Sequence, residues 1–145
     1  MAINFFSEDT SFLVKQKRKR KQWLKEIALQ ESFKILDLNY IFCSDEYLHK
    51  INLQYLDHDT YTDIITFDNS EYEAEIEGDI YISIDRVKEN AKDHKVDQET
   101  ELSRVLSHGL FHLIGYKDKT RSEANTMREK EEFAISLYKK LNCST

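Results

Sequence analysis

Two histidines and an aspartate near the C-terminal end of the chain have the spacing of metal ligands. His108 and His112 stand four residues apart in the segment HGLFHLIGYKD, so in a helix both imidazoles leave the same face, about one turn apart. Gly115 follows where a left-handed residue can end the helix, and Asp118 can then return its carboxylate over that face. Two imidazoles and one carboxylate leave one position of a zinc ion open, which is typical of a catalytic site.

A histidine pair at this spacing also occurs as an ordinary packing or hydrogen-bonding pair within a helix. Glycine favours the metal interpretation, because the chain has only three glycines and one of them, Gly109, lies between the histidines. Glycine inside a helix costs about 1 kcal/mol relative to alanine. We therefore expect Gly109 to allow the close approach of a substrate or of another backbone.

The segments around these residues predict an α+β fold. Leu38, Tyr40 and Phe42 alternate with polar residues, as in a strand with one buried face. Asp97 can cap the helix that carries both histidines, and Thr120 with Glu123 can form a capping box for the next helix. We expect a small mixed four-stranded β-sheet covered by about five helices, with the metal site on the penultimate helix and the loop after it. The expected order is a strand at 3–6, a helix at 11–30, a strand at 36–42, a helix at 45–55, strands at 63–67 and 78–84, and helices at 85–95, 98–114 and from 121 onward.

Length and composition indicate one globular domain, residues 1–145. The chain has a formal net charge of −6, 40% hydrophobic and 33% charged residues, and no proline. This composition excludes a disordered, fibrous or collagen-like protein, and no apolar run has the roughly 18 residues of a membrane span. The N-terminus lacks the features of a signal peptide. Cys43 and Cys143 lie a hundred positions apart, so we expect no disulfide framework and a reducing, cytoplasmic setting.

The motif HGLFHLIGY, with TDIITF and GDIYIS upstream in that order, resembles the YbeY family of metal-dependent endoribonucleases, which act in ribosomal RNA maturation and ribosome quality control. The resemblance spans roughly residues 38–119. It implies cleavage of single-stranded RNA, including maturation of the 3′ end of 16S ribosomal RNA, with one zinc ion per chain and with ribosomal RNA and the ribosome as partners.

Three positions differ from the family pattern. The family usually has a histidine where Asp118 stands, an aspartate is common where Lys117 stands, and an arginine is usual at the position of Leu56. A carboxylate is a competent ligand, and two histidines with one carboxylate suit iron(II) as well as zinc. The spacing with aspartate in the third position also resembles metzincin peptidases.

The missing arginine leaves a phosphate-binding role open. Arg104, one turn before His108, and Lys117 are our candidates for the positive charge at the scissile phosphate. The alternative for Arg104 is an ordinary ion pair with Glu101 or Asp97.

The general base is also open. In H-E-x-x-H peptidases the glutamate is the base, but here residue 109 is a glycine, which cannot transfer a proton. The candidates are a metal-bound hydroxide, Asp63, Asp79 and a phosphate oxygen of the substrate.

A basic run near the N-terminus is a candidate RNA-binding surface. Residues 57–101 hold 15 acidic against 4 basic residues, so the positive charge is concentrated elsewhere, and a local basic patch attracts the RNA backbone. The alternative is a solvated helix face without a binding role. The candidate residues are Lys15, Lys17, Arg18, Lys19, Arg20 and Lys21.

Two other classes of function remain. One is a metal-dependent peptidase or small-molecule hydrolase, which Gly109 and the basic run disfavour. The other is a non-catalytic ribosome-assembly module with a structural metal, which would need a fourth protein ligand. His58 and His94 are the histidines that could supply it.

Overall fold

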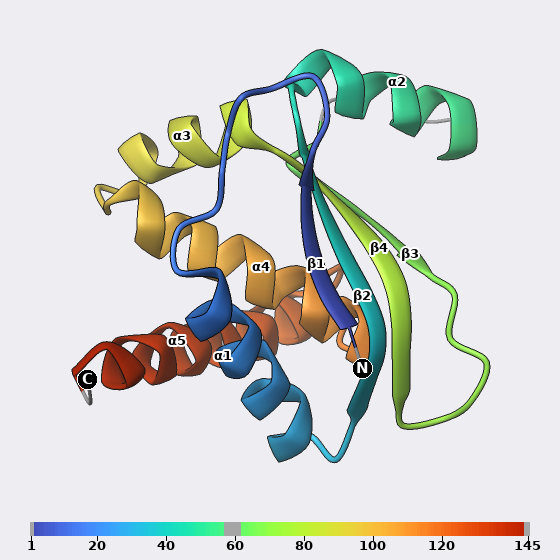
Figure 1. Cartoon of the computed structure of the whole chain (residues 1–145), viewed down its shortest axis with the longest axis vertical. Coiled ribbons are helices and arrows are strands. Elements are labelled where there is room, and N and C mark those ends of the chain that lie inside the picture. Colours follow the sequence, from blue (N-terminus) through green and yellow to red (C-terminus); the bar gives the residue numbers. More distant parts are fainter. Residues whose placement is uncertain (1, 57–61, 144–145) are drawn as a thin grey trace.

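The computed structural model describes residues 2–56 and 62–143. The strands are β1 (Ala2–Ser7), β2 (Lys34–Cys43), β3 (Ile64–Asp68) and β4 (Glu75–Ser83), and the helices are α1 (Lys17–Gln30), α2 (Asp45–Leu56), α3 (Ile84–Asp93), α4 (Gln98–Ile114) and α5 (Arg121–Cys143). The strands form one mixed sheet in the order β1-β2-β4-β3 (Figure 1). The four strands and five helices follow one another as the sequence predicts, and the fold is α+β.

Strand direction follows from the connections. β1 and β2 are parallel, and α1 crosses between them, as a parallel pair requires. β4 is parallel to β2 because the chain first returns antiparallel through β3 and then reverses again before β4. β3 pairs antiparallel with β4, and this hairpin places β3 at one edge of the sheet. The edge strand contacts α4, so the helix with both histidines lies beside it.

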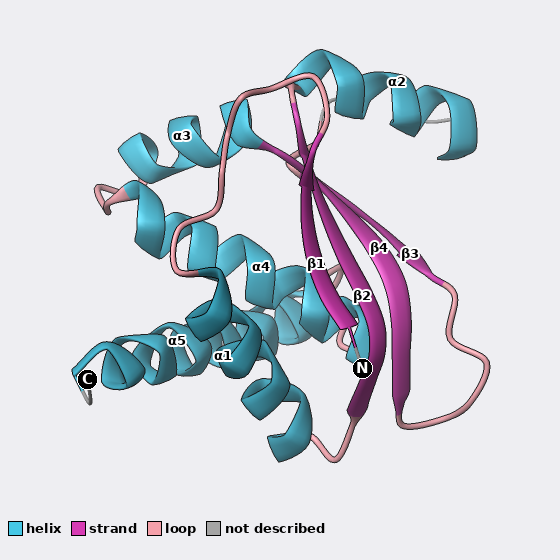
Figure 2. Cartoon of the chain, in the orientation of Figure 1, coloured by secondary structure: helices cyan, strands magenta, loops and turns pink. Residues whose placement is uncertain are grey.

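Helices cover one face of the sheet (Figure 2). α1, α3 and α4 pack on that face, and α5 packs on α1 and α4. α2 packs against one end of the opposite face. Two buried hydrogen bonds of 2.8 Å hold these layers together. The hydroxyl of Tyr40 on β2 donates to the carbonyl oxygen of Leu106 on α4. The indole N–H of Trp23 on α1 donates to the carbonyl oxygen of Ala134 on α5. Such bonds set the position of α4 over the sheet.

The predicted caps of α4 and α5 are confirmed. Asp97 accepts a 2.7 Å hydrogen bond from the backbone N–H of Thr100, and α4 ends at Gly115 with φ 124°. Thr120 and Glu123 accept hydrogen bonds from each other's backbone N–H, both at 3.0 Å. These local signals are strong because each satisfies backbone groups that a helix end leaves unpaired.

The first helix begins later than expected. α1 starts at Lys17, and Gln16 has the left-handed φ of 57°. In the segment before it, Phe12 and Val14 turn towards the core while Leu13 is 73% exposed, which is the alternation of an extended chain. The prediction of a helix from residue 11 was wrong because the sequence pattern counted Leu13 as part of the buried stripe.

Strand β4 also begins earlier than expected, because Glu75 to Glu77 continue the hairpin.

No helix among the described residues is long and apolar enough to cross a membrane.

Candidate metal centre

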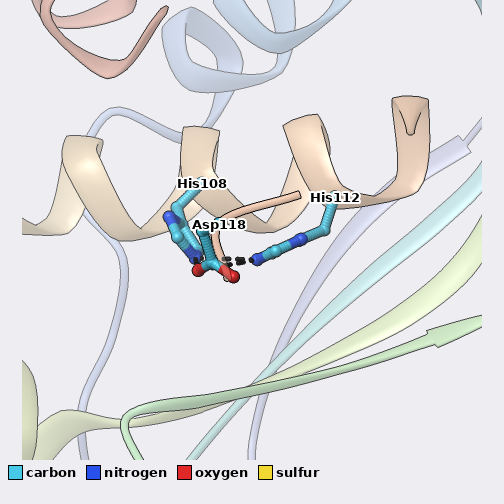
Figure 3. Close-up of side chains that lie close together, drawn as sticks. All are labelled: His108, His112 and Asp118. Carbon is cyan, nitrogen blue, oxygen red and sulfur yellow. Dashed lines mark hydrogen bonds and ion pairs between the residues drawn. The ribbon is translucent and has the colours of Figure 1, made fainter. Parts of the chain in front are cut away.

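His108, His112 and Asp118 converge on one point beside α4 (Figure 3). The two Nε2 atoms of the histidines are 2.9 Å apart, and Asp118 Oδ2 lies 3.4 Å from each of them. The predicted trio is therefore brought together, by helix geometry for the histidines and by the turn after α4 for the carboxylate.

Hydrogen bonds on the other side of each ring fix the tautomers. His112 Nδ1 lies 3.0 Å from the carbonyl oxygen of Tyr116, which can only accept, so this nitrogen carries the hydrogen. His108 Nδ1 lies 2.6 Å from Glu131 Oε2, a carboxylate, which also accepts. When both rings are neutral, both Nε2 lone pairs face Asp118.

Three electron-pair donors that face one another are stabilised by a cation between them. Two imidazole nitrogens and a carboxylate oxygen are the donor set of catalytic zinc and of non-haem iron(II) sites. The backing of each imidazole by an acceptor is the usual outer arrangement of a metal-binding histidine. The residues present therefore fit a divalent transition metal.

The turn that carries Asp118 is held from outside the motif. Gly115 donates to the carbonyl oxygens of Phe111 and His112, and Tyr116 stacks edge-on against Phe111 at 5.7 Å. The hydroxyl of Tyr116 donates to Glu31 at 2.7 Å. The other carboxylate oxygen of Glu31, at the end of α1, accepts from Lys130 on α5, also at 2.7 Å. These hydrogen bonds connect α1 and α5 to Tyr116, whose carbonyl oxygen orients His112.

Glu131 changes the electrostatics of the site. Burial lowers the pKa of His108, but the hydrogen bond and charge of Glu131, together with Asp118 and Asp63, outweigh it and raise that pKa above its ordinary value. The environment thus favours positive charge at this point, whether it comes from a proton or from a metal ion.

Gly109 has a different role from the one predicted. A Cβ at this position would lie 2.9 Å from Cδ1 of Ile80 and 3.0 Å from Cδ1 of Ile64. The close neighbours are side chains of the sheet rather than a substrate or another backbone, so this expectation was wrong. The missing side chain lets α4 approach the sheet and keeps the two histidines next to its edge.

A cavity of about 440 Å³ adjoins His108. α4 contributes Glu101, Arg104 and His108, the β3 side contributes Asp63, and α5 contributes Arg128. β3 and α5 both pack against α4, and residues on or next to all three elements line the cavity.

Comparisons with known proteins show the family of this chain. The family model described as Endoribonuclease YbeY matches residues 3–139. The chain belongs to the YbeY endoribonuclease family. The Endoribonuclease YbeY of Cytophaga hutchinsonii is 58% identical over 137 residues, which cover 94% of this chain and 96% of that protein. That of Christiangramia forsetii is 50% identical over 136 residues, 94% of each chain. A solution structure from Thermotoga maritima matches with a TM-score of 0.66 and 28% identity, over 94% of this chain and 89% of that one.

In this YbeY family member, Arg104 lies in an ion-pair cluster. Its guanidinium lies 3.4 Å from Glu101, 3.2 Å from Glu131 and 3.4 Å from Glu132. The alternative of an ion pair with Glu101 is therefore what the structure shows, and Asp97 instead caps α4. Because the charge of Arg104 is balanced by carboxylates, its predicted place at a phosphate is disfavoured.

The other candidates from the sequence separate into two groups. Asp63 lines the cavity with His108, so it stays a candidate base. Asp79 lies between Gly78 and Ile80, which face α4, and therefore points to the opposite face, where it accepts a 3.0 Å hydrogen bond from Asn39. The structure does not bring Asp79 to the metal centre. Lys117 is exposed beside Asp118.

No fourth protein ligand joins the trio among the described residues. His94 is held by Glu101, at 3.0 Å from its Nδ1, and lies outside the group of three ligands. His58 lies outside the described residues. Three protein ligands fit a catalytic rather than a closed structural metal site.

The basic run divides into buried and exposed parts. Arg20 is 1% exposed and forms a 2.7 Å ion pair with Glu99 on α4, so its predicted contact with RNA was wrong. Lys19 lies over the ring of Tyr138, 4.7 Å from its centroid. The remaining cations are on the outer side of α1, where a groove of about 560 Å³ is lined by Lys17, Arg18, Lys21, Gln22 and Lys25.

Glu131 and the carbonyl of Tyr116 are the site components that the sequence did not predict. A carboxylate 23 residues after His108 carries no spacing signal, because it reaches the site only through the packing of α5 on α4. The carbonyl of Tyr116 could have been predicted from its position directly after the capping glycine, since the backbone there must fold back over the last turn of the helix.

Proposed function

We propose that this chain is a metal-dependent endoribonuclease that hydrolyses single-stranded RNA, and that residues 1–145 form one catalytic domain. Relatives named Endoribonuclease YbeY match it over nearly their full length. The observation that carries the proposal is the convergence of His108, His112 and Asp118, with both Nε2 lone pairs directed at one point. We further propose ribosomal RNA as the substrate, with maturation of the 3′ end of 16S ribosomal RNA and ribosome quality control in the cytoplasm as the processes served.

We propose zinc as the metal, with His108, His112 and Asp118 as its ligands. A bound divalent metal supplies Lewis acidity at a phosphate oxygen and lowers the pKa of a coordinated water. Glu131 and the carbonyl of Tyr116 keep both imidazoles in the tautomer that can bind it. Iron(II) suits the same donor set, and metal analysis of the purified protein distinguishes the two.

Asp63 is the proposed proton acceptor, because it is the acidic candidate that shares the cavity with His108. Its role is to accept a proton from the attacking water. RNA is proposed to reach the centre with help from the basic groove on α1, whose exposed cations attract a phosphate backbone irrespective of sequence. Lys15, which is exposed just before this helix, extends the surface that begins at Lys17.

The alternatives are less well supported. A peptidase of the H-E-x-x-H type uses a glutamate as base, whereas this chain has Gly109, whose place is filled by sheet side chains. A structural metal has four protein ligands, and the described residues provide three.

The test is cleavage of a labelled single-stranded RNA by the zinc-loaded protein. We expect cleavage that is abolished by a chelator, restored by added zinc and absent in His108→Ala. A double-stranded RNA and an unfolded protein substrate serve as controls. Hydrolysis of the protein substrate without cleavage of RNA would overturn the proposal.

A further inference from the structure

We propose that Arg128, on α5, binds a phosphate group of the RNA strand beside the metal centre. The inference rests on the proposed function and adds a substrate-binding residue to it. Arg128 lines the same cavity as His108, the ligand from α4. It enters that cavity from the helix that also supplies Glu131.

Most of the carboxylates that line this cavity contact Arg104. Three carboxylates, on Glu101, Glu131 and Glu132, lie within 3.4 Å of the guanidinium of Arg104. Two of them also contact histidines: Glu101 contacts His94 and Glu131 contacts His108. Arg104 is therefore engaged in holding α4 to α5.

Arg128 is in the opposite situation. Glu131 and Glu132 stand three and four residues after it, where a helix usually forms local ion pairs, yet both interact with Arg104. Within the described residues no ion-pair partner of Arg128 is found, and its side chain is exposed. It is a cation at the cavity that is available for a ligand.

An anionic ligand needs such a cation here. Asp63 borders the cavity from the β3 side, and a phosphodiester that approaches the metal would be repelled by this carboxylate. A guanidinium presents parallel N–H donors that match two phosphate oxygens. Arg128 offers this fork from α5, whereas Asp63 stands next to β3, so the strand would lie with a phosphate against α5 and its reacting bond next to the metal.

The cavity holds both functional groups that the reaction needs. A proton acceptor must face the attacking water, and a cation must face the phosphate. Asp63, next to β3, and Arg128, on α5, line the same cavity as His108.

The experiment compares Arg128→Gln with Lys140→Gln, which removes the same charge from the last turn of the same helix. Cleavage of single-stranded RNA by the zinc-loaded proteins is measured across a salt series. We expect Arg128→Gln to lower kcat/KM about tenfold and to reduce the slope of log kcat/KM against log salt by about 0.7, the value for one contact to single-stranded nucleic acid. Arg128→Lys should keep the slope and recover part of the rate. Lys140→Gln should match the parent.

Zinc content and thermal unfolding of each variant separate substrate binding from a structural role. If Arg128→Gln loses zinc or stability, or if it behaves as Lys140→Gln does, the inference is overturned. RNAs with single methylphosphonate linkages give a second readout: one neutral linkage should slow the parent and leave Arg128→Gln unaffected.

If the parent does not cleave RNA, the proposed function fails. The inference is then decided by the affinity of the same variants for labelled RNA, where Arg128→Gln alone should bind more weakly.

Discussion

Glu131 on α5 accepts a 2.6 Å hydrogen bond from Nδ1 of His108 on α4. The bond reaches from the longest helix of the described structure to the helix that carries both histidines of the proposed metal site, and it orients the opposite nitrogen of the ring. It also lies within the cluster in which Arg104 contacts Glu131 at 3.2 Å. The packing of α5 on α4 therefore determines the direction and the charge of His108, a proposed metal ligand.

Removal of this carboxylate should weaken the metal site. We expect Glu131→Ala to lower zinc affinity by about 10-fold to 100-fold, which is typical when an outer partner of a metal-binding histidine is lost. Zinc affinity is measured by competition with a chromophoric chelator. Glu132→Ala is the matched control, because Glu132 contacts Arg104 and does not contact His108. Equal losses in the two variants would show that the hydrogen bond itself is unimportant.

The metal ligands predict a stoichiometry. The parent should bind one divalent metal ion per chain, and His108→Ala and His112→Ala should each lose it, because two of the three converging donors are their Nε2 atoms. Elemental analysis of the purified proteins measures this. His94→Ala should retain the metal, since His94 contacts Glu101 outside the trio. Full stoichiometry in both His108→Ala and His112→Ala would place the metal elsewhere.

Asp118 should be replaceable by histidine. An imidazole can occupy the same position in a zinc site, so Asp118→His should keep the metal, whereas Asp118→Ala should bind it much more weakly. Zinc titration of the two variants and of the parent provides the comparison. If Asp118→Ala and the parent have the same affinity, Asp118 is not a ligand.

A methyl group at Gly109 should destabilise the fold. Its Cβ would lie 2.9 Å from Cδ1 of Ile80, and overpacking of this kind costs about 1–3 kcal/mol. This is more than the roughly 1 kcal/mol that alanine gains in a helix, so we expect a lower free energy of unfolding in urea. Ile80→Val removes that Cδ1 atom, so the double variant should be less destabilised than the sum of the single variants. Strict additivity would exclude the contact as the cause.

Glu31 should make stability depend on acid pH. Burial alone would raise the pKa of Glu31, but the hydrogen bonds from Lys130 and Tyr116 lower it below the ordinary 4.5. A carboxyl with a lowered pKa stabilises the folded state above about pH 4.5, and this contribution is lost as the pH falls through the lowered value. Glu31→Gln should therefore be less stable than the parent at pH 7, and the difference should shrink in acid.

Denaturant unfolding of the parent and of Glu31→Gln between pH 7 and pH 3 measures this difference. Glu26→Gln on α1 is the control, because the hydrogen-bond partner of Glu26 within the described residues is the nearby Gln30. If the difference in free energy of unfolding between the parent and Glu31→Gln is the same at all pH values, the ion pair with Lys130 does not cause it.

The sequence by itself determined the proposed metal ligands and the order of the elements. His108 and His112 lie on one helical face by spacing alone, and the caps at Asp97, Gly115 and Thr120 involve residues at most a few positions apart. Such local geometry depends on the backbone of one segment, so it can be read without the rest of the chain.

Only the tertiary structure decided which charged residues remain available for function. Arg20 and Lys21 are neighbours in one basic run, yet the packing of α1 buries Arg20 against Glu99 and leaves Lys21 in the outer groove. Arg104 and Arg128 both line the cavity, but three carboxylates surround the first. Partners that lie 23 or more residues apart meet only when helices dock, because docking depends on the summed burial of many side chains rather than on any local pattern.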